Sequence, residues 1–163
     1  EEKAAIFGRA ADYVWEKYGM TPVFLPIERR LDVGAAQKAA MYIKKAPYRI
    51  IHATGSSDHT IGLFARMQAV VSMRLHALVF SAGQGVPVVG MSYDIKVDGF
   101  LKYIGSRTCL QLSSVKAEPL CRLIDECVSG ALDNEVYRTA EMLRERESEN
   151  VKGAAKLLNI SEN

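Results

Sequence analysis

Residues 69–92 read AVVSMRLHALVFSAGQGVPVVGMS, and this stretch decides the fold class. Its two apolar runs, VVSM and VPVVGMS, are almost continuously hydrophobic. Such runs are typical of parallel strands that are covered on both faces, whereas half-exposed strands alternate. Helical periodicity fills the interval between them, at residues 75–82. A strand, a helix and a second strand in this order predict a parallel βαβ unit.

The same alternation continues through the rest of the chain. Further β-rich runs lie at 22–27, 49–53 and 108–112, and further helical patterns lie at 32–45, 57–67, 96–104 and 119–128. The chain opens in helical periodicity that Gly19 ends, and a long helix runs from Val136 to Leu158. Asp32 and Ser57 are expected to be N-caps. The pattern predicts one α/β domain over residues 1–163, with a Rossmann-like, doubly wound parallel sheet.

Composition is that of an ordinary globular protein, with 48% hydrophobic and 25% charged residues. A net charge of +2 gives no strong field to recruit nucleic acid. The longest apolar stretch, 77–91, is interrupted and shorter than the ~20 residues of a membrane span. Three cysteines without CxxC spacing predict free thiols and no metal site. We expect a cytoplasmic protein without a transmembrane segment.

Two predicted strands end in polar loops of unusual type. The first loop is Ser72-Met73-Arg74-Leu75-His76, and the second is Ser92-Tyr93-Asp94-Ile95-Lys96. In open α/β sheets, ligands bind beyond the carboxyl ends of the strands, where helix N-termini favour anions. Arginine and lysine suit phosphate or carboxylate, and histidine can transfer a proton near neutral pH. Taken singly, a histidine after a strand is more often a cap or a core group than a catalyst, and Arg74 and Lys96 could be solvated residues at helix starts. Together they predict an anion-handling site if the two strands are neighbours.

Other motifs have simpler interpretations. One loop that could bind a phosphate is Ala53-Thr54-Gly55-Ser56-Ser57. It has no Walker lysine, so an ordinary connecting loop is the favoured interpretation. Gly83-Gln84-Gly85 precedes a strand and indicates a turn. His52 and His59 are assigned surface or packing roles.

The stretch VVSMRLHALVFSAGQGVPVVGMSYDIKVDGFLKYIG, residues 70–105, resembles the polysaccharide pyruvyl transferase family. That family shows an Arg-Leu-His after an apolar strand, a proline-containing turn, another strand and a Tyr-Asp-x-Lys. The corresponding residues here are Arg74-Leu75-His76, Pro87 and Tyr93-Asp94-Ile95-Lys96. Within that family, we expect the chain to resemble the CsaB-type enzymes, which pyruvylate a cell-wall polysaccharide that anchors surface-layer proteins.

The resemblance implies a two-domain fold similar to GT-B glycosyltransferases, of which this chain is expected to be the C-terminal half. It implies transfer of the enolpyruvyl unit of phosphoenolpyruvate to a saccharide acceptor, which can be lipid-linked, with a pyruvate ketal and phosphate as products. No cofactor is implied. His76 and Lys96 are the expected catalytic residues. Arg74 is expected to bind substrate or to pair with Asp94, and Ser72, Ser92, Tyr93 and Asp94 are expected to contact substrate or support the site.

Two implications concern the chain by itself. The missing N-terminal domain would supply the acceptor site, so the isolated chain is expected to be inactive. The protein is expected in the cytoplasm, at most peripheral at the inner membrane face.

Two other functions remain open at this point. A nucleotide-sugar glycosyltransferase or epimerase of the same architecture would need a carboxylate for ribose hydroxyls, and Glu118 is the nearest candidate. A non-catalytic binding module would leave Arg74, His76 and Lys96 paired or solvated, facing no common point.

Overall fold

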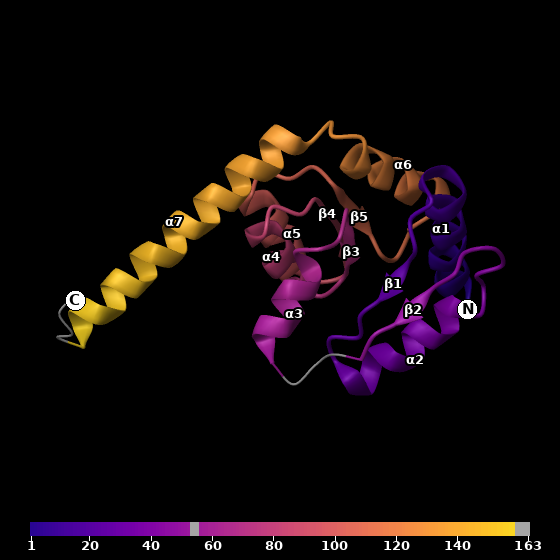
Figure 1. Cartoon of the computed structure of the whole chain (residues 1–163), viewed down its shortest axis with the longest axis horizontal. Helices are drawn as coiled ribbons and strands as arrows, with labels where there is room; N and C mark the ends of the chain where they lie inside the picture. The colour runs from indigo at the N-terminus through magenta and orange to yellow at the C-terminus, as the bar shows by residue number, and fades with distance from the viewer. Residues whose placement is uncertain (53–55, 159–163) are drawn as a thin grey trace.

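A computed structural model describes residues 1–52 and 56–158, the side chain of Arg29 excepted. In this described part, seven helices and five strands alternate along the chain (Figure 1). They are α1 (Glu2–Tyr18), β1 (Val23–Phe24), α2 (Arg29–Ala40), β2 (Arg49–Ile50), α3 (Ser57–Phe64), β3 (Val70–Ser72), α4 (Leu75–Gly83), β4 (Val88–Ser92), α5 (Ile95–Tyr103), β5 (Cys109–Gln111), α6 (Ala117–Val128) and α7 (Asp133–Leu157).

Every strand pair among the described residues is parallel, which confirms the predicted α/β class with parallel strands. β4 lies between β3 and β5, and in this register Ser72 faces Gly90 and Gly90 faces Cys109. β1 and β2 form a separate two-stranded sheet. The strands therefore make two hydrogen-bonded groups where the sequence predicted one continuous sheet.

Prolines help to explain why β1 is so short. Pro22 and Pro26 bracket Val23 and Phe24, and neither proline has an N–H to extend a ladder. An apolar cavity of about 350 Å³ separates β1 from β3, and its wall includes Leu25 and Val71. The two sheets approach each other side by side across this cavity.

Both faces of β4 are covered, as the continuous apolar run predicted. All five of its residues are buried. Val89 and Met91 pack with residues of α1 and α6, whereas Val88 packs with residues of α4 and α5. Successive side chains of a strand point to opposite faces, so each layer of helices takes alternate residues.

Helix boundaries differ from the sequence prediction at several points. Gly19 ends α1 in the left-handed conformation, at φ 66°, as predicted. Asp32 is not the N-cap of α2, because the helix begins at Arg29 with Glu28 as its N-cap. The N-cap of α3 is Ser56 and not Ser57. Aspartate and serine also stabilise a helix from within its first turn, which makes the capping position hard to read from residue type.

The last helix extends beyond the body of the molecule. Ala140 in the first half of α7 is buried, and this part of the helix contacts α4. The second half projects away from the sheets (Figure 1), and Val151 and Leu157 there are exposed. No described helix is both long enough and apolar enough to span a membrane.

Candidate functional site at the carboxyl edge of the sheet

The two polar loops lie side by side at one edge of the three-stranded sheet. β3 ends at Ser72, β4 ends at Ser92, and the two strands are parallel neighbours. The condition on which the predicted site depended is therefore met. The helices that follow, α4 and α5, also contact each other.

His76 and Lys96 occupy equivalent positions in neighbouring strand–helix units. In each unit a serine ends the strand, the second residue after it is the helix N-cap, and the fourth is the second residue of the helix. The Ser72 Oγ accepts a hydrogen bond from the N–H of Arg74 at 2.9 Å, and the Ser92 Oγ donates to the carbonyl of Asp94 at 3.5 Å. This shared turn brings both basic side chains to the same edge, where both are exposed.

The two helix N-termini nevertheless differ in how they are capped. The Asp94 carboxylate accepts a hydrogen bond from the N–H of Lys96 at 2.9 Å. The N-terminus of α5 is therefore already capped by a negatively charged side chain of the same chain. α4 has no side-chain cap, and its first helical hydrogen bond runs from the N–H of Leu78 to the carbonyl of Arg74 at 3.3 Å. The N–H groups of Leu75 and His76 have no partner among the described residues. The open N-terminus of α4 therefore favours an anion.

Arg74 pairs with Asp32 on α2, and the expected pairing with Asp94 is wrong. Its Nε lies 3.1 and 3.2 Å from the two carboxylate oxygens of Asp32, and its Nη2 lies 2.6 Å from Oδ1. Asp94 is unsuited to this role because its carboxylate caps α5. The Nη1 of Arg74 has no hydrogen-bond partner among the described residues.

The ion pair between Arg74 and Asp32 shifts the pKa of both groups. Burial raises the pKa of Asp32, but hydrogen bonds from Arg74 and from the N–H groups of Glu28 and Ile27 outweigh it and leave the pKa lowered. The Asp32 hydrogen bond raises the pKa of Arg74, and Tyr93 and Glu28 add smaller electrostatic effects. Both groups are held in their charged forms.

The remaining predicted residues have distinct surroundings. Tyr93 is 56% exposed, which leaves its phenol accessible to solvent. Ser92 is buried, and its hydroxyl serves the turn after β4. The His76 ring lies 6.1 Å from the Phe80 ring, one helical turn further along α4. His76, Lys96 and Tyr93 thus lie at one edge of the sheet. The hydroxyl groups of Ser72 and Ser92 form hydrogen bonds within the loops that follow β3 and β4.

Sequence reasoning missed Asp32 as a member of the site. An acidic residue in the first turn of a helix is ordinarily assigned to the helix dipole. Its pairing with Arg74 spans 42 residues of sequence and crosses from one sheet to the other. No local pattern signals such a contact.

The other motifs lie away from this edge or outside the described residues. Residues 53–55 of the predicted phosphate-cradle alternative lie outside the described residues. Gly85 adopts φ 73°, which fits the predicted turn. Glu118 is exposed and pairs with Arg122 within α6. All three thiols are free, and burial raises the pKa of Cys127 to about 12.

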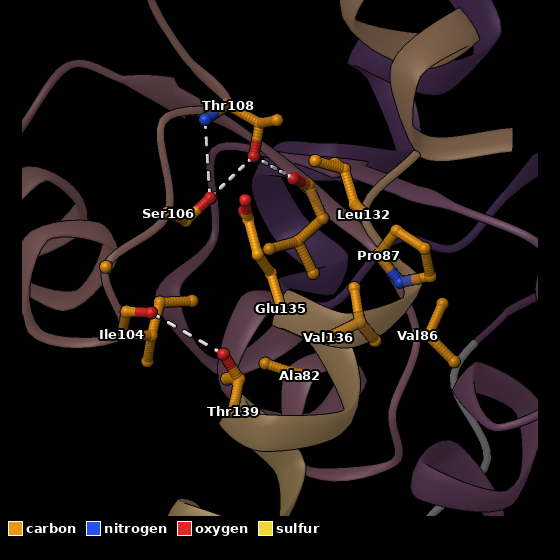
Figure 2. A pocket seen from close by; sticks show the side chains of 12 residues that line it. Ala82, Val86, Pro87, Ile104, Ser106, Thr108, Leu132, Glu135, Val136 and Thr139 are labelled. Carbon is orange, nitrogen blue, oxygen red and sulfur yellow. Dashed lines mark hydrogen bonds between the residues drawn. The ribbon is translucent and has the colours of Figure 1, made fainter. Parts of the chain in front are cut away.

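A small cavity of about 40 Å³ lies at the opposite, amino edge of the sheet (Figure 2). Leu132, Glu135 and Thr139 of the α7 region face Pro87 and Ser106 across it. The Thr139 hydroxyl donates to the carbonyl of Ile104, and hydroxyls of Ser106 and Thr108 bond each other. This cavity holds none of the predicted site residues.

A comparison with known families identifies the family of the chain. The profile of the polysaccharide pyruvyl transferase family matches residues 3–95, which is more than half of the chain. The chain belongs to this family. The matched region includes Asp32 and both polar loops as far as Ile95. No curated protein and no solved structure gives a significant match to the chain.

Membership of the polysaccharide pyruvyl transferase family indicates a transferase that acts on a polysaccharide. At the carboxyl edge, Lys96 is exposed and the neighbouring helix α4 begins without a side-chain cap, a combination that favours an anion.

Proposed function

We propose that this chain carries the donor site of an enzyme that moves the enolpyruvyl unit of phosphoenolpyruvate onto a saccharide. The observation that carries the proposal is that His76 and Lys96 occupy equivalent positions in two neighbouring strand–helix units, of which the first begins its helix without a side-chain cap. Phosphoenolpyruvate bears a phosphate and a carboxylate, and this edge offers amide donors and cations to receive them.

Each group has a distinct role in the proposed reaction. The free N–H groups of α4 and the Lys96 ammonium hold the donor phosphate and stabilise charge as it leaves. His76 gives a proton to the methylene carbon, which leaves a cationic, oxocarbenium-like centre at the adjacent carbon. The Nη1 of Arg74, which has no hydrogen-bond partner in the part of the chain that the structure describes, takes the donor carboxylate.

Ketal formation then needs two hydroxyl groups of the acceptor. The first attacks the oxocarbenium carbon and loses its proton, and the bond from that carbon to the phosphate oxygen breaks with the electron pair leaving on phosphate. The second hydroxyl attacks the same carbon and also loses its proton, which closes the ring. One of these protons restores His76 and the other goes to the departing phosphate or to solvent, so the reaction needs no cofactor.

The family supports a polysaccharide acceptor. We propose that this acceptor is a saccharide of the cell wall or cell surface, as in the branch that anchors surface-layer proteins. Exposed Tyr93 is suited to contact it, because an aromatic ring offers an apolar face together with a hydroxyl. We place the reaction in the cytoplasm, with a lipid-linked acceptor reached at the inner membrane face. The acceptor site belongs to a further domain of a GT-B-like enzyme, so the isolated chain should bind donor without transferring it.

Calorimetric titration of phosphoenolpyruvate into the chain tests the donor site. His76→Ala and Lys96→Ala should each weaken saturable binding. The loss should be about tenfold or more for Lys96→Ala, which removes the ammonium group proposed to hold the donor phosphate. Lys102→Ala is the matched control, since Lys102 is an exposed lysine near the far end of α5. A uridine nucleotide should not bind.

Three outcomes would contradict the proposal. Binding of the nucleotide in place of phosphoenolpyruvate would indicate a glycosyltransferase or epimerase. Equal weakening by Lys102→Ala would indicate a non-specific charge effect. Absence of any binding would contradict the proposal that this chain carries the donor site.

A further inference from the structure

Among the described residues, one hydrogen-bonded side-chain pair joins the two sheets at the carboxyl edge. Among the hydrogen bonds of the described residues, only those between Arg74 and Asp32 connect the β1–α2–β2 segment with the three-stranded sheet. The apolar cavity of about 350 Å³ lies between the same two parts, and both residues line it. Within residues 1–52 and 56–158, no strand ladder joins β1 to β3.

Asp32 is itself held firmly enough to act as a fixed point. Its Oδ2 accepts the N–H of Glu28 at 2.9 Å and that of Ile27 at 3.2 Å. Its carboxylate meets the Arg74 guanidinium through both Nε and Nη2, a fork that fixes orientation as well as distance. The side chains of Arg74 and Asp32 are only 26% and 19% exposed, so solvent screens the pair weakly.

Arg74 connects this fixed point to the proposed donor site. It is the N-cap of α4, and His76 follows two residues later. A displacement of Arg74 would therefore move the uncapped amide groups and His76 relative to Lys96, which sits on α5. Asp32, which holds Arg74, thus helps to fix the positions of the α4 amide groups and of His76 at the proposed donor site.

We propose that Asp32 is a positioning residue, which holds the open N-terminus of α4 in place through Arg74. Its effect on catalysis rests on the proposed function, whereas its hold on α4 does not. Asp32 touches no reacting atom in this scheme. It acts by keeping His76 and the N-terminal amide groups of α4 in a fixed position relative to Lys96.

Hydrogen exchange tests the hold on α4 independently of any activity. Asp32→Asn should accelerate exchange of the amides of Leu78 and the following turn several-fold, because the carbonyl of Arg74 receives the Leu78 N–H. Asp58→Asn is the control, since Asp58 is an acidic residue in the first turn of α3. Unchanged exchange in Asp32→Asn, or equal acceleration in both variants, would overturn the proposal.

Kinetics of the complete enzyme test the consequence for catalysis. Asp32→Asn should lower kcat about tenfold or more with a smaller change in KM for phosphoenolpyruvate. Arg74→Lys keeps the charge but loses both the fork to Asp32 and the Nη1 proposed to hold the donor carboxylate, so it should lower kcat and also raise KM. The double variant should be no slower than the slower single variant, because both changes break one link. Additive losses, or losses confined to KM, would overturn the positioning role.

The two measurements separate this proposal from the proposed function. An unsubstituted enzyme that transfers no pyruvyl group would contradict the proposed function, while hydrogen exchange would still decide whether Asp32 holds α4. Normal transfer by the unsubstituted enzyme with unaltered kcat in Asp32→Asn would contradict the positioning role alone. Thermal unfolding of each variant identifies any loss that comes from a smaller folded fraction.

Discussion

Leu101 on α5 packs directly against the backbone of Gly90 in β4. A Cβ atom at position 90 would collide with the Cδ1 of Leu101 and lie 3.2 Å from its Cγ. Leu101 is 2% exposed and cannot turn outward without leaving the core. The absence of a side chain at position 90 therefore lets α5 lie close to the middle strand of the sheet.

Replacement of Gly90 by alanine should lower the free energy of unfolding by about 1–3 kcal/mol, because the extra methyl group overpacks the core. Urea unfolding measures the change. Gly99→Ala is the matched control on α5, since nothing lies within 4 Å of a Cβ there. That change should raise stability by about 0.5–1 kcal/mol through helix propensity. Equal effects at the two positions would contradict the packing argument.

The Asp32–Arg74 pair should make stability depend on pH in the acid range. Burial raises the pKa of Asp32, but its hydrogen bonds hold it below the ordinary value of 3.8. Such a group contributes stability that is fully present above its unfolded pKa and is lost as pH falls through the folded pKa. The stability difference between the unsubstituted chain and Asp32→Asn should therefore be constant above about pH 5 and shrink below pH 3.8.

Urea unfolding of both proteins between about pH 6 and pH 2.5 gives this difference directly. The comparison is needed because Asp12 and Asp125 also have lowered pKa values and contribute to acid unfolding of the whole chain. A difference that stays constant down to the lowest pH would contradict an ionised pair in the native state.

The three thiols should react slowly while the chain is folded. Burial raises the pKa of Cys127 to about 12 and also raises those of Cys109 and Cys121. The thiolate is the reactive form, so very little of it is present at neutral pH. Titration with a disulfide reagent should show fast reaction of all three cysteines only after denaturation. Rapid reaction of Cys127 in the native state would contradict its buried position.

Asp12 should stabilise the turn that follows α2. Its carboxylate accepts the N–H groups of Lys44, Lys45 and Ala46 at distances from 2.8 to 3.2 Å. Asp12→Ala leaves these groups without their acceptor and should cost about 1–3 kcal/mol of stability, measured by urea unfolding. Asp133→Ala on α7 is the control, and a loss no larger than in that variant would contradict the role.

The sequence predicted the centre of the fold better than its edge. Continuous apolar residues identified β4 because both of its faces are covered, and the flanking helices followed from their periodicity. The run at 22–27 predicted a longer strand than the two residues of β1. Strand length depends on a partner in space, and the prolines on either side of β1 limit the ladder.

The candidate site was likewise predictable only in part. Its position was predictable because the carboxyl ends of parallel neighbours meet at one edge, and Ser72 and Ser92 end two such strands. The partner of Arg74 was not predictable. Asp94 is nearer in sequence, but the N–H of Lys96 already occupies its carboxylate, and Asp32 is 42 residues away from Arg74.

The projecting half of α7 has a consequence for the motion of the whole molecule. A helix of 25 residues is about 37 Å long, whereas a compact chain of this size has a radius of gyration of about 15 Å. The molecule should therefore tumble faster about the long axis of α7 than end over end. Amide ¹⁵N relaxation rates should then depend on whether each N–H bond lies along that axis or across it.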